Sequence, residues 1–185
     1  MSGEILEKNL SNIQDDFLYA LEQGKVEAVG IMGWSGRRKY NITNSKGYYP
    51  AMVAYQLGKI ETCKSLLNLY SNPYKGNYIG FQQQSTNEKM TLLMMAAEKN
   101  DITTIKKLEL LENDKDSELM NKDGYTAMML AAENGCQEVI EWAIEKGYQR
   151  IWKFQSTQGK MKGKTPIDVA KTKEIKKLIK IASEK

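Results

Sequence analysis

The sequence predicts an all-α solenoid of about five helix-turn-helix units in a single domain, and three observations favour this fold class. One alanine recurs at a nearly constant spacing, a glycine or asparagine follows it four residues later, and apolar residues recur at helical spacing on both sides of that turn. The 185 residues, with 41% hydrophobic and 27% charged side chains, are also enough for one domain with its own core.

The clearest unit spans residues 123–147. Its first half, 126–134, has helical apolar spacing after a threonine that is suited to cap a helix. Gly135 then interrupts the pattern, and a second apolar stripe follows. That stripe contains Val139, Ile140, Ala143 and Ile144. The segment therefore predicts a helix, a tight turn and a second helix.

The same pattern occurs in five copies when the alanine is used as the anchor. The anchors are separated by 34, 42, 35 and 39 residues and are Ala20, Ala54, Ala96, Ala131 and Ala170. Four copies carry a residue that tolerates a left-handed backbone at the end of the first helix. These turn residues are Gly24, Gly58, Asn100 and Gly135. A small anchor allows neighbouring helices to approach closely, so we expect all five alanines to be buried.

These copies resemble the ankyrin-repeat family, whose unit of about 33 residues carries T-P-L-H-x-A before its first helix. The matching stretches are YPAMVA, TLLMMA, TAMMLA and TPIDVA at residues 49–54, 91–96, 126–131 and 165–170, with 15–20 as a degenerate first copy. Methionine or aspartate replaces the family histidine, at Met52, Met94, Met129 and Asp168. The resemblance implies one domain over 1–185, with repeats at 10–44 (N-terminal cap), 45–85, 86–120, 121–159 and 160–185 (C-terminal cap).

The stretch GKMKGKTP at 159–166 is close to a phosphate-binding loop but does not match one. Such a loop needs four residues between its glycines and a buried strand before it, whereas Gly159 and Gly163 enclose three. Thr165 and Pro166 fit the start of a repeat instead, where threonine caps and proline pre-sets the first helical turn.

The last unit reads as an amphipathic helix with a basic face. Apolar and basic positions separate onto opposite sides of the predicted helix. The apolar side contains Ile175, Leu178, Ile179 and Ala182, and the basic side contains Lys173, Lys176, Lys177 and Lys180. A membrane-surface helix has a similar pattern, but its place after Ala170 favours a cap on the solenoid.

Insertions lengthen the spacing in two places and predict fingers that protrude along one edge. They lie at 70–89 and 149–164, and a shorter third segment lies at 33–49. Within 151–156, Ile151, Lys153 and Gln155 alternate with Trp152, Phe154 and Ser156 before a turn that contains glycine, which suggests a β-hairpin. We therefore expect β-hairpin fingers that carry aromatic and basic residues.

The resemblance implies a module that binds a protein through the first helices and the tips of the inter-repeat turns. Tyrosine among mixed polar residues has the composition of an interface. The positions expected on that surface or on the fingers are Arg37, Arg38, Tyr40, Tyr48, Gln56, Tyr74, Tyr78, Met90, Glu98, Lys99, Asp123, Tyr125, Glu133, Asn134, Trp152 and Lys153.

Charge is distributed in blocks along the chain. The net charges of 1–32, 33–85, 86–149 and 150–185 are −4, +6, −6 and +8. Because the two basic blocks contain the aromatic fingers, an adaptor for an anionic ligand, RNA or a phosphoinositide, is the alternative function. The acidic block between them would repel a nucleic acid that lies along the whole surface, which favours a protein partner.

The residue content gives no support to catalysis. Histidine is absent, which removes the usual general base and the commonest zinc ligand. Cys63 and Cys136 are too few for a disulfide framework, and neither has a histidine to activate it. We therefore expect a non-enzymatic, cytoplasmic monomer that acts as scaffold, adaptor or inhibitor, with no catalytic residue, cofactor, metal or membrane span.

Overall fold

A computed structural model describes residues 18–28, 43–70, 84–108 and 118–184. The chain divides into two compact units, which are treated one at a time below. Unit 1 comprises residues 1–80 and 85–87, and unit 2 comprises residues 81–84 and 88–185. The described residues form helices, turns and extended connections, and none of them forms a strand. Within this part of the chain, no helix combines the length and the apolar character needed to cross a membrane.

Unit 1 contains short helical segments at 18–22 and 26–28 and the helix pair α3 and α4. Helix α3 spans Pro50–Gln56 and packs against α4, which spans Ile60–Tyr70. Proline occupies the first turn of α3, where its missing N–H leaves no hydrogen bond unmade. The core contains the predicted anchors Ala20 and Ala54, which are 6% and 0% exposed.

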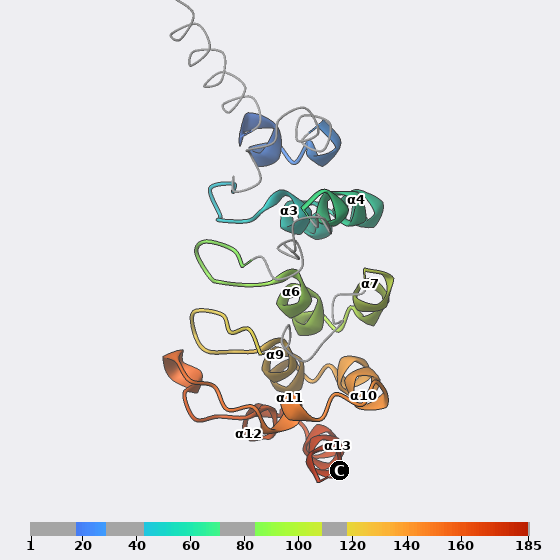
Figure 1. Cartoon of the computed structure of the whole chain (residues 1–185), viewed down its shortest axis with the longest axis vertical. Coiled ribbons are helices and arrows are strands. Elements are labelled where there is room, and N and C mark those ends of the chain that lie inside the picture. The colour runs from blue at the N-terminus through green and yellow to red at the C-terminus, as the bar shows by residue number, and fades with distance from the viewer. Residues whose placement is uncertain (1–17, 29–42, 71–83, 109–117, 185) are drawn as a thin grey trace, which may run out of the picture. The chain divides into compact units, whose positions relative to one another are not determined.

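The described residues of unit 2 form three successive helix pairs, with one short α-helix and one 3-10 turn in addition. Figure 1 shows the pairs following one another along the unit. The first helices of the pairs are α6 (Leu92–Glu98), α9 (Ala127–Asn134) and α12 (Pro166–Val169). Their second helices are α7 (Ile102–Lys107), α10 (Gln137–Glu145) and α13 (Lys173–Ser183), and α11 (Arg150–Lys153) and η2 (Gly159–Met161) lie between α10 and α12. Helix α9 packs between α6 and α12, while α10 contacts both α7 and α13. First helices therefore pack on first helices and second helices on second helices.

The first helices of unit 2 are buried over most of their length. Residues 92–97 of α6 and 127–132 of α9 are each at most 5% exposed. Ala96 and Ala131 are both 0% exposed, as the small anchor predicts for closely packed neighbouring helices. Removing this apolar surface from water at about 25 cal/mol per Å² is the main contribution to stability here.

Threonine caps begin these helices as the repeat pattern predicts. The Thr91 hydroxyl accepts a hydrogen bond from the Met94 amide at 3.1 Å, and Thr126 accepts one from the Met129 amide at 3.3 Å. At α12 the threonine side chain donates a hydrogen bond instead of accepting one. The Thr165 amide and hydroxyl both donate to Asp168 Oδ2 at 2.8 Å.

The four predicted turn residues all have a left-handed backbone. Their φ angles are 66°, 71°, 56° and 81° for Gly24, Gly58, Asn100 and Gly135. Each turn reverses the chain between the two helices of a pair. The left-handed backbone of these turns therefore explains why glycine or asparagine occurs four residues after the anchor.

The predicted β-hairpin finger at 150–164 is wrong. Residues 150–153 form helix α11, on which the neighbouring residues Ile151 and Trp152 are both 2% exposed. A strand would place these two side chains on opposite faces, but α11 packs against both α12 and α13 and buries the adjacent pair. The Ser156 amide donates to Lys164 O at 2.9 Å and the Gly163 amide donates to Ser156 O at 2.7 Å, which closes the segment at its base without a strand. Most of the other two predicted segments, at 33–49 and 70–89, falls outside the described residues, which leave out 29–42 and 71–83.

Candidate functional site

The site is built on a turn, here called the tip turn, that precedes α9. Asn121 is 8% exposed, and its Oδ1 accepts hydrogen bonds from the Asp123 amide at 3.0 Å and the Tyr125 amide at 2.9 Å. The Gly124 amide donates to Asn121 O at 3.0 Å. An asparagine side chain that satisfies the backbone two to four residues later fixes a tight turn. The turn therefore presents Lys122 and Asp123 from a fixed backbone.

Asn121 is absent from the predicted site residues, although the sequence contains a signal for it. The spacing Asn-x-x-Gly recurs at Asn44 and Gly47 in unit 1, where the Asn44 Oδ1 accepts from the Tyr48 amide at 2.9 Å. The Gly47 amide also donates to Asn44 O at 2.8 Å. Asn121 is buried and Asn44 is half-buried, and both hold the backbone of their turns through side-chain hydrogen bonds.

Successive turn segments of unit 2 are joined by a backbone hydrogen bond and an ion pair. The Lys122 amide donates to Glu88 O at 3.0 Å, and the Met161 amide donates to Asp123 O at 3.1 Å. The side chains of Lys122 and Glu88 pair at 2.6 Å, and those of Lys160 and Asp123 pair at 3.3 Å. All four side chains are at least 42% exposed, so the solvent screens both ion pairs and neither contributes much to stability. Figure 1 shows these segments on the same side of unit 2.

Tyr125 joins the tip turn to the end of α9. Its ring is 6% exposed, and its hydroxyl donates to Glu133 Oε1 at 2.7 Å. Lys160 Nζ lies 5.2 Å from the ring centroid, within the range of a cation–π contact. Burial, followed by the bond to Glu133, raises the pKa of the Tyr125 phenol to about 12, so the phenol stays a hydrogen-bond donor at neutral pH. Tyr125 thus connects the tip turn to Glu133, and little of its own surface is available to a partner.

The exposed part of α6 and α9 is confined to their C-terminal ends. Four polar residues lie there at equivalent positions of two helices that pack side by side. This helix-end row consists of Glu98, Lys99, Glu133 and Asn134. Within the described residues, the carboxylates of Glu98 and Glu133 form no ion pair. The row is therefore an accessible surface with two carboxylates that no cation of the described residues pairs with.

Met90 and Asn134 each form a hydrogen bond within unit 2 that the sequence does not reveal. Met90 is half-buried, and its sulfur accepts from Asn121 Nδ2 at 3.5 Å. Asn134 is exposed, and its Nδ2 donates to Leu130 O at 2.9 Å. Both residues lie at the site, but the polar atoms available to a partner come mainly from Asn134 and its neighbours.

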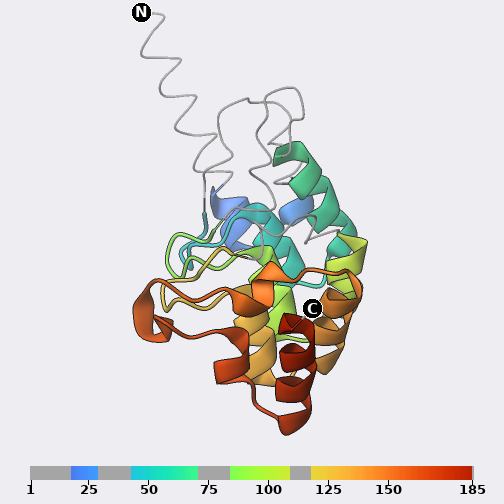
Figure 2. The ribbon, with the colours of Figure 1, turned by 60° about the horizontal axis from the view of Figure 1, so that its bottom comes forward.

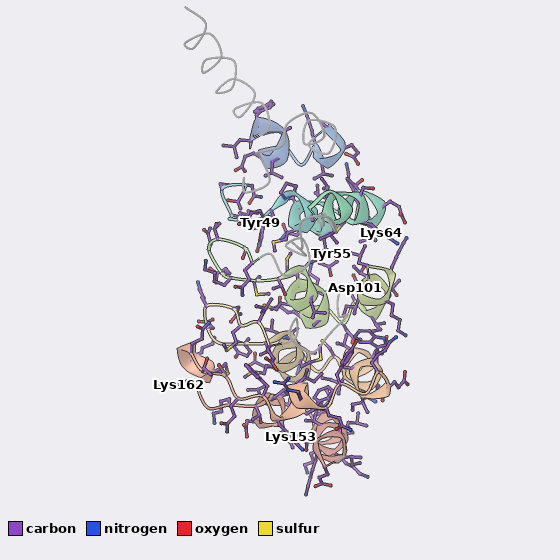
Figure 3. The ribbon with its side chains drawn as sticks, viewed as in Figure 1. Tyr49, Tyr55, Lys64, Asp101, Lys153 and Lys162 are labelled. Carbon is purple, nitrogen blue, oxygen red and sulfur yellow. The ribbon has the colours of Figure 1, made fainter. Side chains whose placement is uncertain are left out.

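Unit 1 holds two of the predicted positions. Tyr48 is half-buried beside its tip turn, and Gln56 is exposed at the end of α3 next to Leu57, which is 50% exposed. In Figure 3 the neighbouring Tyr49 lies at the start of α3. The remaining predicted positions on the first two fingers lie outside the described residues and are Arg37, Arg38, Tyr40, Tyr74 and Tyr78.

Trp152 is a correction to the predicted surface. Its indole is 2% exposed in the core of unit 2, so it cannot contact a partner without unfolding of α11. Lys153 on the same helix is exposed, and Figure 3 places it beside α13. Trp152 therefore does not belong to the predicted edge of basic and aromatic side chains.

The two thiols are part of the core. Cys63 is 0% exposed, and burial raises its pKa to about 12. Cys136 is 5% exposed, burial is the main cause of its raised pKa, and its Sγ lies 3.5 Å from Glu98 O. A thiol with a raised pKa is a poor nucleophile at neutral pH. Among the described residues, no three potential metal ligands come together.

These features define a helical repeat protein in which tip turns and first-helix ends form the accessible surface. The comparison with protein families agrees: residues 93–182 match the family described as ankyrin repeats (3 copies). The three helix pairs of unit 2 therefore belong to the ankyrin-repeat family, which confirms the resemblance seen in the sequence motifs. No curated protein matches the chain. Ankyrin repeats are in general protein–protein interaction modules.

Proposed function

We propose that this chain is a non-enzymatic interaction module that holds a protein partner against the tip turns and the helix-end row of unit 2. The observation that carries the proposal is the helix-end row itself. Helices α6 and α9 bury residues 92–97 and 127–132, yet each ends in two exposed polar residues at the same repeat positions. A row of this kind on packed helices offers a rigid surface, which lowers the entropic cost of binding.

The charges of this surface favour a basic segment of the partner. The side chains of Glu88 and Asp123 are already paired with lysines, whereas Glu98 and Glu133 keep accessible carboxylates. An arginine or lysine of a partner could pair with either carboxylate. The tie between Tyr125 and Glu133 holds one of the two in place, which improves the geometry of such a pair.

The chemistry of the described residues supports a binding role over a catalytic one. Both cysteines are buried with raised pKa values, and the chain has no histidine. At the 149–164 segment the anionic-ligand alternative loses support, because base stacking needs exposed aromatic side chains and Trp152 is buried. We retain a cytoplasmic monomer as part of the proposal.

The test compares two charge-reversal variants of the full chain as baits in an affinity capture with mass spectrometry. Glu98→Lys with Glu133→Lys changes the helix-end row, and the control Glu138→Lys with Glu145→Lys changes exposed residues of α10 by the same charge. We expect a set of partners that the wild type and the control capture and the helix-end variant loses. Equal capture by both variants would contradict the proposed binding face.

A specific partner then allows a quantitative measurement. Removal of a carboxylate that pairs with a partner cation at the centre of an interface costs about 2–5 kcal/mol, and removal of a rim charge costs much less. Isothermal titration of the Glu98→Gln and Glu133→Gln variants would rank the two positions. We expect the larger loss at Glu133, because its carboxylate is held by Tyr125.

A further inference from the structure

Helix α13 presents a face of unpaired lysines, here called the lysine face, on the side opposite its buried residues. The buried side contains Ile175, Ile179 and Ala182, which are 1%, 0% and 4% exposed and pack toward α10, α11 and α12. The lysine face contains Lys173, Lys176, Lys177 and Lys180, all of them exposed. Figure 2 brings this helix, in dark red, to the front of unit 2.

The four charges can act on one surface at the same time. With 3.6 residues per turn, positions 173, 176, 177 and 180 fall within an arc of about 100°, and they span about 10 Å along the helix axis. Within the described residues, none of the four ammonium groups forms an ion pair. Flexible lysine side chains over this arc can all reach a plane that is tangent to the helix.

The acidic groups near the lysine face are few. Asp168 is the nearest acid on α12, and its pKa is lowered first by the backbone bond from Thr165, then by the Thr165 hydroxyl, and further by the charges of Lys164 and Lys176. Its carboxylate already accepts two hydrogen bonds from Thr165. On α13 itself, Glu174 lies beside the face and Glu184 lies at its C-terminal end. The face therefore keeps a local excess of positive charge.

We propose that the lysine face is a docking surface for an anionic lipid bilayer. Lysine is a compact point charge without the planar fork with which arginine binds a single phosphate or carboxylate bidentately. Such charges are attracted to the field of a negative plane and need no defined pocket. Exposed Ile181, at 47%, is the only large apolar side chain of α13 that could touch the bilayer surface. Because the apolar side of the helix is held in the core, docking is peripheral and does not insert the helix.

The features of the face favour a bilayer over a nucleic acid. Recognition of single strands relies on aromatic stacking, and recognition of duplex bases by side chains requires an element that enters a groove. The lysine face has no aromatic side chain, Trp152 on the adjacent α11 is buried, and the opposite side of α13 is packed in the core of unit 2. A convex helix with charges spread over an arc of about 100° suits a broad plane better than a narrow groove.

The experiment measures binding of the full chain to vesicles rich in phosphatidylserine and to vesicles of phosphatidylcholine alone. We expect binding only to the anionic vesicles, and loss of that binding at about 1 M salt, where the Debye length is about 3 Å. The triple variant Lys176→Gln, Lys177→Gln, Lys180→Gln should bind on the order of 100-fold more weakly, since each lysine near an anionic leaflet adds about fivefold, or about 1 kcal/mol.

A matched control changes three exposed lysines outside α13, Lys64→Gln, Lys106→Gln and Lys146→Gln, and removes the same charge. We expect this control and the triple variant with arginine at 176, 177 and 180 to bind within a few-fold of the wild type. Equal loss in the control, or no preference for phosphatidylserine, would overturn the proposal. Tighter binding to a duplex RNA than to the anionic vesicles, lost in the glutamine variant, would assign the face to nucleic acid and would also overturn it.

Discussion

The repeats that contain α6 and α9 have the same backbone plan but fill its left-handed positions with different residues. In the α9 repeat both positions are glycines, Gly124 with φ 89° and Gly135 with φ 81°. In the α6 repeat they are Lys89 with φ 57° and Asn100 with φ 56°. Side chains with a Cβ are strained in this region by about 1–2 kcal/mol, less for asparagine.

The difference shows where the stability of unit 2 is concentrated. The α6 repeat tolerates two residues that its turns do not favour, and within the described residues Asn100 Oδ1 is also buried without a hydrogen-bond partner. The α9 repeat has neither cost, and it packs between the α6 and α12 repeats. We infer that the α9 repeat stabilises its neighbours.

The largest expected effect is that of Gly124→Ala. A Cβ here would lie 2.1 Å from Gln158 O and 2.6 Å from Ser156 Oγ, in addition to the strain of its φ angle. We expect a loss of about 2–5 kcal/mol in the free energy of unfolding, measured by urea denaturation. Gly147→Ala is the control, because it has φ 76° and nothing within 4 Å of the added Cβ. Equal losses in the two variants would show that the close approach of the next segment is unimportant.

A second comparison enlarges the anchor alanine in each repeat. Ala96 and Ala131 are both 0% exposed on helices that pack together, so a leucine at either position must displace neighbours. We expect Ala131→Leu to destabilise by about 1–3 kcal/mol and Ala96→Leu by less, since the α9 helix has neighbours on both sides. Thermal unfolding would rank the variants, with Glu138→Leu on the exposed side of α10 as a control for added leucine. A larger destabilisation by Ala96→Leu than by Ala131→Leu would contradict the inference that the α9 repeat stabilises its neighbours.

A glycine at the strained position of the α6 repeat should raise stability. Lys89→Gly removes the left-handed strain, and the greater freedom of glycine in the unfolded chain offsets part of the gain. We expect a net increase of about 0.5–1 kcal/mol in the free energy of unfolding. The same change in a helix, Lys106→Gly in α7, should lower it by about 1 kcal/mol. A loss at both positions would mean that the Lys89 side chain stabilises the turn.

The smallest expected effect extends the comparison to the α12 repeat and depends on pH. Asp168 bonds the Thr165 amide and hydroxyl, where the other two repeats have Met94 and Met129. Its pKa is lowered in the folded state, so its stabilising effect is present above the unfolded-state pKa of about 3.9 and is lost as the pH falls through the lower folded-state pKa. Asp168→Ala should cost roughly 0.5 kcal/mol at neutral pH. The melting temperatures of the two proteins in thermal unfolding should approach each other as the pH falls below the unfolded-state pKa, and a difference that does not decrease there would contradict this role.

Much of the fold could be predicted from the sequence, because it depends on patterns of residues that are close together along the chain. The anchor alanines, the left-handed turn residues, the threonine caps and the amphipathic α13 each depend on residues close together along the chain. The candidate site was predicted less well. Glu98, Lys99, Glu133 and Asn134 are exposed as expected from their repeat positions, whereas Tyr125 and Trp152 are buried.

The failures have a common cause in contacts between segments distant in sequence. The alternation at 151–156 predicts a strand. The packing of α11 against α12 and α13 instead stabilises a helix that buries Ile151 and Trp152 together. Tyr125 reads as an interface residue, but Lys160 covers its ring from the next turn segment.

By itself, the sequence determined that this protein is made of repeated helix pairs, because helical periodicity, caps and turn residues act within a few positions of one another. Only the tertiary structure decided which polar side chains reach solvent, which carboxylates are neutralised and which lysines are unpaired. Burial and ion pairing depend on neighbours that lie 30 or more residues away, such as Glu88 for Lys122 and Asp123 for Lys160. A one-dimensional pattern does not contain those neighbours until the chain is folded.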